Sequence, residues 1–320
     1  MVSRAHAVVA VFRRPLRSAS TAWLMRSLLA GVALWTAAPA AAVAPSPAAA
    51  LQARHAALAG QLGNAAFGRP LLLDSAASSG GLQGDIYARI DYPFATVSAA
   101  LNDPAHWCDI LILHINTKFC RATAGPDRAR LSVKVGKKIP QPLEDTHPIE
   151  FSYHVAAASP GFLAIRLDAP QGPMGTHDYR IRLRAVPVGD GQTFLHLSYA
   201  YAYGAAGRLA MQAYLASLGR DKVGFTPTGR QRDGQPELIG GMRGVAERNT
   251  MRYYLAIDAY LGALGAAPAS QLQQRLQHWF SATEQYPRQL RELDRTTYLD
   301  MKRDEYRRQQ TPQRTETRGQ

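Results

Sequence analysis

The sequence predicts an α+β domain in which an antiparallel sheet packs one face against helices. The first observation is a series of segments in which apolar and polar residues alternate, as they do in half-buried strands. The apolar positions are Ile86, Ala88 and Ile90; Leu131, Val133 and Val135; Ile149, Phe151, Tyr153 and Val155; Leu163, Ile165 and Leu167; Tyr179, Ile181 and Leu183; and Leu195, Leu197, Tyr199 and Tyr201. The second observation is the short turns at 159–161 and 188–191, which suit antiparallel hairpins. The third is an apolar stripe at helical spacing over 245–264, which predicts a long helix that covers the sheet.

The first 42 residues have the order of a secretory signal peptide. Basic residues, among them Arg13 and Arg26, precede an uncharged run over 27–35, and small residues follow as far as Ala42. We expect cleavage after Ala42, or after Ala44, and therefore a periplasmic or secreted protein. The alternative is an uncleaved membrane anchor, although the apolar run is shorter than the ~20 residues that a span needs.

Removal of this leader changes the charge balance. The whole chain has a formal net charge of +13, and the leader holds five basic and no acidic residues, so about +8 remains. This weakens a case for nucleic acid, and we expect no nucleic-acid partner. Peripheral contact with an anionic membrane surface stays open.

The elements before the strands follow from local signals. Residues 43–81 are rich in Ala, Pro, Ser and Gly and are expected to form a spacer with one short helix over 51–62, so order begins near Leu82. Pro93 opens a helix that ends near Asn102. Asp103 then caps a second helix that begins at Pro104.

The elements after the strands are helical with one long interruption. A short amphipathic helix over 208–218 is closed by Gly219, and a glycine-rich excursion over 219–244 precedes the long helix. Two further helices are expected over 271–280 and 288–308, with disorder beyond Gln309. The predicted division is a leader at 1–42, a spacer at 43–81, a domain at 82–265 that includes the 205–244 helix and insertion, and a charged helical tail at 266–320.

Cys108 and Cys120 lie twelve positions apart in the exported part of the chain. In an oxidising compartment such a pair predicts a disulfide, and two buried thiols are the alternative. No histidine spacing of zinc type accompanies them. We therefore expect no metal and no organic cofactor.

The order of elements resembles that of the START-like helix-grip superfamily, also called SRPBCC. The resemblance begins with the segment IDYPFATVSAALNDPAHW, residues 90–107, and covers 82–264. The helix at 208–218 and the glycine-rich excursion depart from the pattern. The resemblance implies a curved sheet that grips a long C-terminal helix around an apolar cavity, which relatives use to hold lipids, sterols, polyketides or other apolar ligands. Some relatives are enzymes, so the fold alone does not decide function.

Tyrosines on the side of the strands that is expected to face the helices are candidates for the wall of such a cavity. A buried tyrosine hydroxyl needs a partner, and a dry core would rarely collect so many of them. The alternative is that the hydroxyls reach the rim of the domain and bond to water or backbone. The candidates are Tyr153, Tyr179, Tyr199 and Tyr201, with Tyr203 further along the last strand.

Arg248 and Arg252 are candidates for the polar end of the cavity. They lie one turn apart on the long helix, where like charges cost a few tenths of a kcal/mol unless an anion lies between them. That anion is either Asp178, Glu247, or the carboxylate or phosphate of a ligand. A solvated or internally paired helix face is the alternative.

Catalytic patterns are weak in comparison. His177 and Asp178 are adjacent in a strand, which predicts side chains on opposite faces. His154 and His196 alternate with the apolar residues of their strands, so their side chains should point to the outer face of the sheet and are expected at the surface. Neither a Gly-x-Ser-x-Gly elbow nor a His-Glu-x-x-His motif occurs.

Taken together, these observations favour an exported binding or transfer protein for an apolar or amphipathic, lipid-like molecule over an enzyme. One alternative is a cyclase, dehydratase or hydrolase that uses the same cavity, with a tyrosine or His177 as general acid or base. Another is an envelope adaptor that recruits a partner through the tail at 266–320.

Overall fold

The computed structural model describes residues 44–64, 67–124, 129–189, 191–217 and 219–311, and the chain from Pro45 onward forms one compact unit. The predicted leader and the segment beyond Thr311 lie outside the described residues. No helix within the described ranges is long and apolar enough to cross a membrane.

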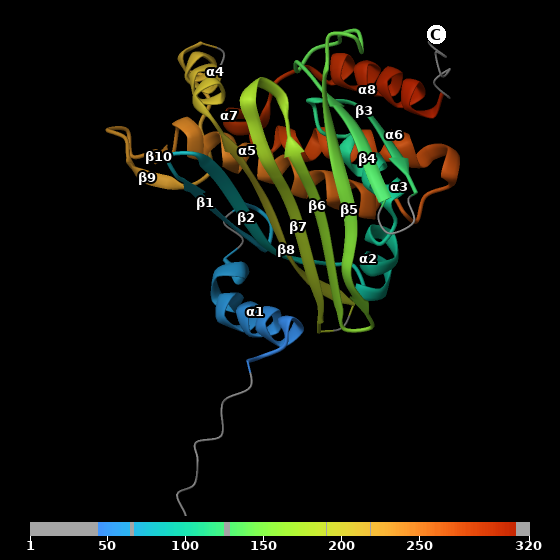
Figure 1. Ribbon diagram of the computed structural model, residues 1–320. Helices are drawn as coiled ribbons and strands as arrows, with labels where there is room; N and C mark the ends of the chain where they lie inside the picture. Colours follow the sequence, from blue (N-terminus) through green and yellow to red (C-terminus); the bar gives the residue numbers. More distant parts are fainter. Residues whose placement is uncertain (1–43, 65–66, 125–128, 190, 218, 312–320) are drawn as a thin grey trace, which may run out of the picture. The chain divides into compact units, whose positions relative to one another are not determined.

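An eight-stranded, fully antiparallel sheet forms the centre of the unit, with strand order β1-β2-β8-β7-β6-β5-β4-β3 (Figure 1). The strands are β1 (Leu71–Ala77), β2 (Gly81–Ile90), β3 (Thr117–Thr123), β4 (Ala129–Val135), β5 (His147–Ser159), β6 (Phe162–Gln171), β7 (Thr176–Val188) and β8 (Gln192–Tyr203). The sheet is open, with β1 and β3 at its edges. The 3-10 turn η1 (Pro173–Gly175) connects β6 to β7.

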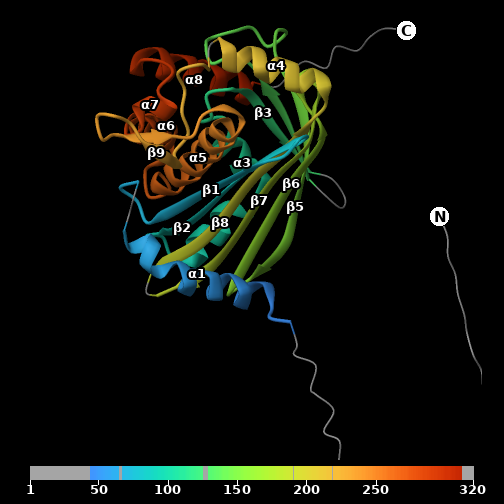
Figure 2. The same cartoon turned by 90° about the vertical axis from the view of Figure 1, so that its left-hand side faces the viewer.

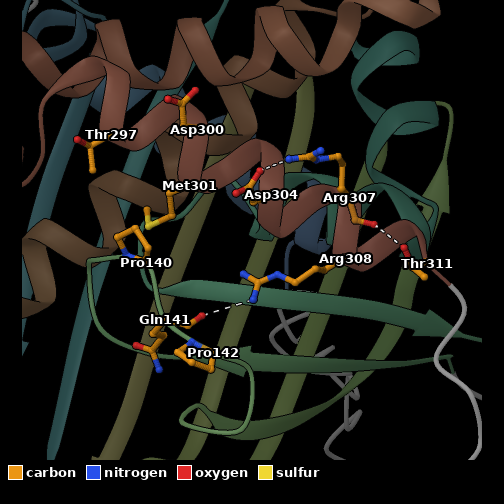
Figure 3. A pocket seen from close by; sticks show the side chains of 10 residues that line it. All are labelled: Pro140, Gln141, Pro142, Thr297, Asp300, Met301, Asp304, Arg307, Arg308 and Thr311. Carbon is orange, nitrogen blue, oxygen red and sulfur yellow. Dashed lines mark hydrogen bonds and ion pairs between the residues drawn. The ribbon is translucent and has the colours of Figure 1, made fainter.

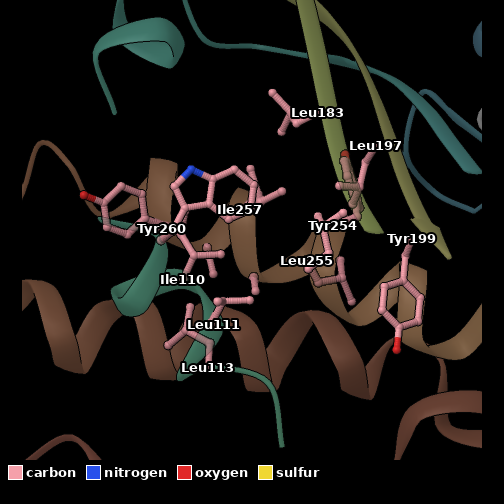
Figure 4. Packing of buried hydrophobic residues seen from close by; sticks show 14 of the residues in the cluster. Ile110, Leu111, Leu113, Leu183, Leu197, Tyr199, Tyr254, Leu255, Ile257 and Tyr260 are labelled. Atoms are coloured by element: carbon pink, nitrogen blue, oxygen red, sulfur yellow. The ribbon is translucent and has the colours of Figure 1, made fainter. Parts of the chain in front are cut away.

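Three helices cover the inner face of the curved sheet: α2 (Phe94–Leu101), α3 (Pro104–Leu111) and the long α5 (Gly241–Gly262) (Figures 1 and 2). The predicted stripe on α5 is buried, and side chains from α5, β7 and β8 interdigitate (Figure 4). Leu183, Leu197 and Leu255 at this contact are all completely buried. The chain has an α+β helix-grip fold of START-like type, as the sequence predicts. A strand is followed by two helices, then by antiparallel strands, and finally by a long helix that the sheet grips.

A second helical layer lies behind α5 (Figure 2) and consists of α6 (Pro268–Glu284), α7 (Pro287–Leu290) and α8 (Arg295–Gln310). Leu276, Trp279 and Tyr298 from this layer belong to the same buried cluster as the sheet and α5. As a result α5 is buried around most of its circumference. Residues 266–311 are therefore an integral part of the unit.

The helix α1 (Pro47–Gly63) packs on the outer face of the sheet. Leu58 and Leu62 contact Phe194 there, so this face is partly covered and not simply solvated. For this reason the expected surface position of His196 is wrong. Its side chain points outward but is only 6% exposed, and it bonds to Asp85 at 2.7 Å. His154 is exposed, as expected.

Two strands of the central sheet, β1 and β3, were not predicted from the sequence. β1 lies inside the predicted spacer, where LLLDSAA has no alternation because a leucine run is followed by small residues. It nevertheless pairs with β2 from Leu71 opposite Ala88 to Ala77 opposite Leu82. β3 begins with four buried residues because α8 covers its other side, which removes the period-two pattern. Order therefore starts well before Leu82.

The region between β8 and α5 contains α4 (Ala205–Ala216) and a small hairpin of β9 (Pro227–Arg230) and β10 (Pro236–Leu238). The predicted excursion is therefore partly ordered. Glu247 of α5 holds it in place, because this buried carboxylate accepts bonds from the backbone N–H of Thr226 at 3.0 Å and from its hydroxyl at 2.7 Å. Ser75 of β1 donates to the same carboxylate at 2.7 Å.

The predicted disulfide between Cys108 and Cys120 is present and joins α3 to β3. The two Cα atoms are 5.2 Å apart, and both residues are buried. The bridge therefore ties the helices beside the inner face to an edge of the sheet.

Candidate ligand-binding site

A pocket of about 260 Å³ lies at one end of the grip, where β7, β8 and α5 meet η1 and α4. Its volume is slightly below the range of about 300–1,000 Å³ that is typical of small-molecule sites. The residues that line it are Asn116, Lys138, Pro173, Met174, Thr176, Tyr179, Tyr199, Tyr201, Gly207, Ala210, Met211, Tyr214, Val245, Arg248, Asn249 and Arg252. One part of the lining is thus aromatic and apolar, and the other is cationic.

Tyr179, Tyr199 and Tyr201 form the aromatic wall. The rings of Tyr179 and Tyr201 stack with centroids 5.1 Å apart. The Tyr179 hydroxyl donates to Thr176 Oγ1 at 2.8 Å, whereas the hydroxyls of Tyr199 and Tyr201 make no hydrogen bond within the described part of the chain. Burial raises the pKa of Tyr199 and of Tyr201 above the ordinary phenol value, so both remain neutral hydrogen-bond donors.

Tyr153 and Tyr203 do not line the pocket. The Tyr153 hydroxyl donates to the carbonyl of Leu101 at 3.0 Å, deep between β5 and the helices. The Tyr203 hydroxyl donates to the carbonyl of Ser78 at 3.1 Å. Both hydroxyls are satisfied by backbone, which is the alternative that the sequence left open.

His177 and Asp178 differ from their expected geometry. A bulge in β7 inserts one residue opposite Tyr201, and Asp178 adopts a left-handed φ of 52°. The two side chains therefore lie side by side, with His177 Nδ1 2.9 Å from the Asp178 carboxylate, and not on opposite faces. The pair is largely exposed and does not line the pocket.

Arg248 and Arg252 both line the pocket, and each is only 2% exposed. Arg248 makes one hydrogen bond, from Nη1 to the carbonyl of Val223 at 3.1 Å, and pairs with no carboxylate among the described residues. Neither Asp178 nor Glu247 lies between the two arginines, because Asp178 bonds to His177 and Glu247 holds the excursion. The guanidinium of Arg248 is thus buried at the wall of the pocket and has no carboxylate partner among the described residues.

Glu292, between α7 and α8, is the carboxylate that pairs with Arg252 and with Lys138. It lies 2.7 Å from Arg252 Nη2 and 2.6 Å from Lys138 Nζ, with Lys222 Nζ at 3.9 Å. Burial opposes ionisation, but the charges of Arg252 and Lys138 outweigh it and lower the pKa of Glu292. Three cationic side chains line the pocket and one carboxylate is bonded to two of them, so positive charge is in excess.

Sequence reasoning did not identify Lys138, Glu292 or Tyr214. Lys138 donates to the Tyr214 hydroxyl at 3.2 Å and so joins the loop after β4 to α4. Burial raises the pKa of Tyr214, but the charges of Lys138 and Arg248 outweigh this and bring it below the ordinary value. Lys138 and Glu292 come from segments without periodic signal, whereas Tyr214 lies in the predicted helix over 208–218, and only tertiary contacts bring the three residues together.

A second hollow of about 810 Å³ lies on the surface between α8 and the loop at 140–142 (Figure 3). Its charged side chains are engaged with neighbours. Arg307 pairs with Asp304, and Arg308 donates to the carbonyl of Gln141 at 3.4 Å. No group of three or more His, Cys, Asp or Glu side chains in the described ranges could hold a metal ion. The pocket at the end of the grip is therefore the better candidate site.

Comparisons with known proteins found no matching family model and no matching curated protein. Solved structures do match. An aromatase/cyclase, Zhui, from Streptomyces sp. R1128 is 13% identical, and the alignment covers 62% of this chain and 94% of that chain with a TM-score of 0.31. Norcoclaurine synthase from Thalictrum flavum is 9% identical, with 46% and 81% covered and a TM-score of 0.31. Human StAR-related lipid transfer protein 5 is 7% identical, with 52% and 89% covered and a TM-score of 0.30.

The strand order and the position of α5 define this chain as a protein of the START-like helix-grip fold. Within that fold, its particular features are the helix α4 beside the pocket and the cationic side chains of Lys138, Arg248 and Arg252 in the pocket lining.

Proposed function

We propose that this protein is an exported binding or transfer protein that holds an anionic, amphipathic, lipid-like molecule in the pocket beside α4. The observation that carries the proposal is Arg248, a buried guanidinium with no carboxylate partner among the described residues. Burying a charge without a partner costs several kcal/mol. A carboxylate or phosphate in the pocket would remove that cost, and the fork of arginine binds either group in a bidentate manner.

The aromatic wall supports an apolar portion in the same ligand. Tyr179, Tyr199 and Tyr201 line the pocket with aromatic rings, and Met174 and Met211 add flexible apolar surface. The free hydroxyls of Tyr199 and Tyr201 supply donors near the cations. An amphipathic molecule with one acidic end matches this lining better than a purely apolar one does.

Two features support export. The order of the first 42 residues is that of a cleavable leader. The disulfide between Cys108 and Cys120 fits an oxidising compartment. We also propose that the protein meets an anionic membrane surface, and that neither a cofactor nor nucleic acid takes part.

The test is mass spectrometry of lipids extracted from protein that was purified from the periplasm. We expect an anionic amphiphile to co-purify. Arg248→Gln should lower its retention about tenfold, because one charge-assisted pair to the ligand is lost while Arg252 keeps its bond to Glu292. Arg248→Ala combined with Arg252→Ala should lower retention further.

The matched control is Arg180→Gln, which removes an exposed arginine from the outer face of β7 and should leave retention unchanged. Protein that is recovered empty and binds no member of a broad lipid panel would contradict the proposal. Equal retention by Arg248→Gln and the wild type would do so as well.

One observation favours an enzyme in the same pocket as a second candidate. Tyr214 lines the pocket, accepts a bond from Lys138, and has a lowered pKa, as a general acid or base would require. His177 does not support this candidate because it lies outside the pocket. Ultraviolet titration of the phenolate in the wild type and in Tyr214→Phe tests the point. If no tyrosine whose signal disappears in Tyr214→Phe ionises below the ordinary range, this candidate is excluded.

A further inference from the structure

The three large apolar side chains that are most exposed among the described residues lie on segments that line the pocket, and we call this apolar surface the rim. They are Ile139, which is 51% exposed, Met174 at 62% and Leu209 at 69%. Met174 itself lines the pocket, Leu209 precedes the lining residue Ala210, and Ile139 follows the lining residue Lys138. All three residues therefore belong to segments that contribute to the lining of the pocket.

Helix α4 is the largest part of this apolar rim. Of its twelve residues, AAGRLAMQAYLA, only Arg208 and Gln212 have charged or amide side chains, yet Gly207 is its only buried residue. A helix of this composition normally lies inside a core. Here it lies across the end of the molecule with much of its apolar surface exposed (Figures 1 and 2).

The three parts of the rim are held together. The bond from Lys138 to the Tyr214 hydroxyl joins the loop that contains Ile139 to α4. Gly207 of α4 packs so closely on η1 that a Cβ there would lie 3.3 Å from the carbonyl oxygen of Met174. Met174 has a left-handed φ of 54°, an unfavourable conformation for a residue with a side chain, and its side chain is nevertheless exposed.

Positive charge accompanies the apolar rim. Arg208 lies within α4, and Lys137 and Lys138 directly precede Ile139. The acidic residues nearest to the rim in the sequence are Asp178, which lies four residues after Met174 and bonds to His177, and Glu144 and Asp145 further along the loop with Ile139. Lys138 pairs with Glu292, so Arg208 and Lys137 are the basic residues of the rim that pair with no carboxylate among the described residues. Apolar side chains flanked by basic ones on a surface helix are the features of a helix that lies in the interface of an anionic bilayer.

We infer that this rim, defined by Ile139, Met174 and the exposed face of α4, docks on the surface of an anionic lipid bilayer and so places the mouth of the pocket against the source of its ligand. The inference rests on the proposed function, because the rim surrounds the same pocket. The apolar side chains enter the head-group region, and the basic residues contact lipid phosphates. Ligand exchange then needs no passage of an apolar chain through water.

The experiment is co-sedimentation with vesicles of phosphatidylcholine alone and of phosphatidylcholine mixed with phosphatidylglycerol. The wild type should bind the mixed vesicles more strongly. Leu209→Glu combined with Ile139→Glu should lower binding to them about tenfold or more, since two apolar insertions are replaced by like charges. Neither residue lines the pocket, and both are more than half exposed, so folding and ligand retention should be unchanged.

The matched control is Ser159→Glu, which adds a negative charge at the exposed far end of β5, the strand whose other end follows the loop with Ile139. It should reduce binding much less than the double variant.

The inference is overturned if the wild type fails to bind vesicles, if the double variant binds as well as the wild type, or if Ser159→Glu has the same effect. It is also overturned if sedimentation shows a dimer that Leu209→Glu dissociates, because the rim would then be an interface between two copies. Ligand retention, measured separately, tests the pocket, so each claim can fail alone.

Discussion

At the scale of single residues, the most informative side chain is Glu292, because this carboxylate from outside the sheet and α5 bonds to two of the three cations that line the pocket. It bonds to Lys138 and Arg252 at 2.6 and 2.7 Å. A ligand anion near Arg248 would compete with it for the same cations. Glu292 therefore stabilises the fold and lowers the affinity of the site for anions.

Glu292→Gln separates these two effects. Retention of an anionic ligand should rise severalfold, because a charge that opposes the ligand is gone. The free energy of unfolding should fall by about 2–4 kcal/mol, because the buried Arg252 loses its ion pair. Ligand retention measured by mass spectrometry and chemical denaturation provide the two readouts.

The control is Glu284→Gln, which removes a carboxylate paired with the exposed Arg291 and should change ligand retention very little. Unchanged or weaker retention in Glu292→Gln would show that this carboxylate does not compete with the ligand.

The residues that could be predicted from sequence are those in periodic elements. Tyr179, Tyr199 and Tyr201 fall in one phase of two strands, and Arg248 and Arg252 on one face of a helix, so local spacing brings each group to one surface. Tyr153 shares that phase and the level of Tyr199 in the strand register, but it lies in β5, two strands away from β7, where its hydroxyl bonds to the carbonyl of Leu101. Lys138 and Glu292 come from irregular segments, and no local pattern indicates where such segments fold.

At the scale of elements, α8 is attached to β3 by a cluster of completely buried charges. Glu305 accepts from Lys118 at 2.9 Å and from Lys302 at 2.7 Å. Lys302 also donates to the carbonyls of His114 and Thr117. One carboxylate thus pairs with two ammonium groups, and the remaining contacts of the ammonium groups are to backbone carbonyls and to the sulfur of Met301.

Glu305→Gln should lower the free energy of unfolding by about 3–5 kcal/mol, because two buried ammonium groups lose their only carboxylate in this cluster. Asp304→Asn, the neighbouring change in an exposed pair with Arg307, should stay within about 0.5 kcal/mol. Denaturant titration of both variants measures the difference. Similar stabilities would show that the cluster does not fix α8.

The same cluster predicts a pH dependence at alkaline pH. Burial lowers the pKa of Lys302 to about 8; Glu305 offsets part of this effect, and Lys118 adds to it. Between that value and the pKa of an unfolded lysine, about 10.4, the unfolded chain binds a proton that the folded protein has released. Stability should therefore rise with pH across this window, by at most about 1.4 kcal/mol per pH unit from this group.

Lys302→Met removes that contribution and should flatten the curve, whereas Lys137→Met, at an exposed position, should not. Thermal unfolding over pH 8–10 provides the measurement, with the limits of the window set by the two pKa values. A slope that is equal in the wild type and Lys302→Met would contradict the assignment.

Most elements could be predicted, and the exceptions have physical causes. Helices α2 and α3 follow from local signals, and Asp103 caps α3 with a 2.7 Å bond to the N–H of Ala105, as expected. β1 and β3 lack alternation because one is a leucine run and the other is covered on both sides. Such strands can be recognised only from their partners.

At the scale of the whole molecule, α5 is the element that all layers share. The sheet grips one side of it and α6 packs on the other, so the helix has no solvated face over most of its length. The order of elements along the chain was sufficient to predict the grip. It could not predict the second helical layer, because the amphipathic pattern of 271–308 is equally compatible with a free tail.

This shared helix predicts that the sheet and α6–α8 unfold together. Trp279 packs against Tyr298 with ring centroids 4.9 Å apart, and its indole N–H donates to the carbonyl of Arg252 on α5 at 3.2 Å. Trp107 of α3 is equally buried in the same cluster.

Because one cluster spans both layers, Trp279→Ala should destabilise the protein by about 3–5 kcal/mol, as should Trp107→Ala. Leu209→Ala, at an exposed position, should stay within about 0.5 kcal/mol. Far-ultraviolet circular dichroism and tryptophan fluorescence should report one coincident transition in denaturant for every variant. If α6–α8 instead formed an independent tail, two transitions would appear, and Trp279→Ala would shift only the first of them.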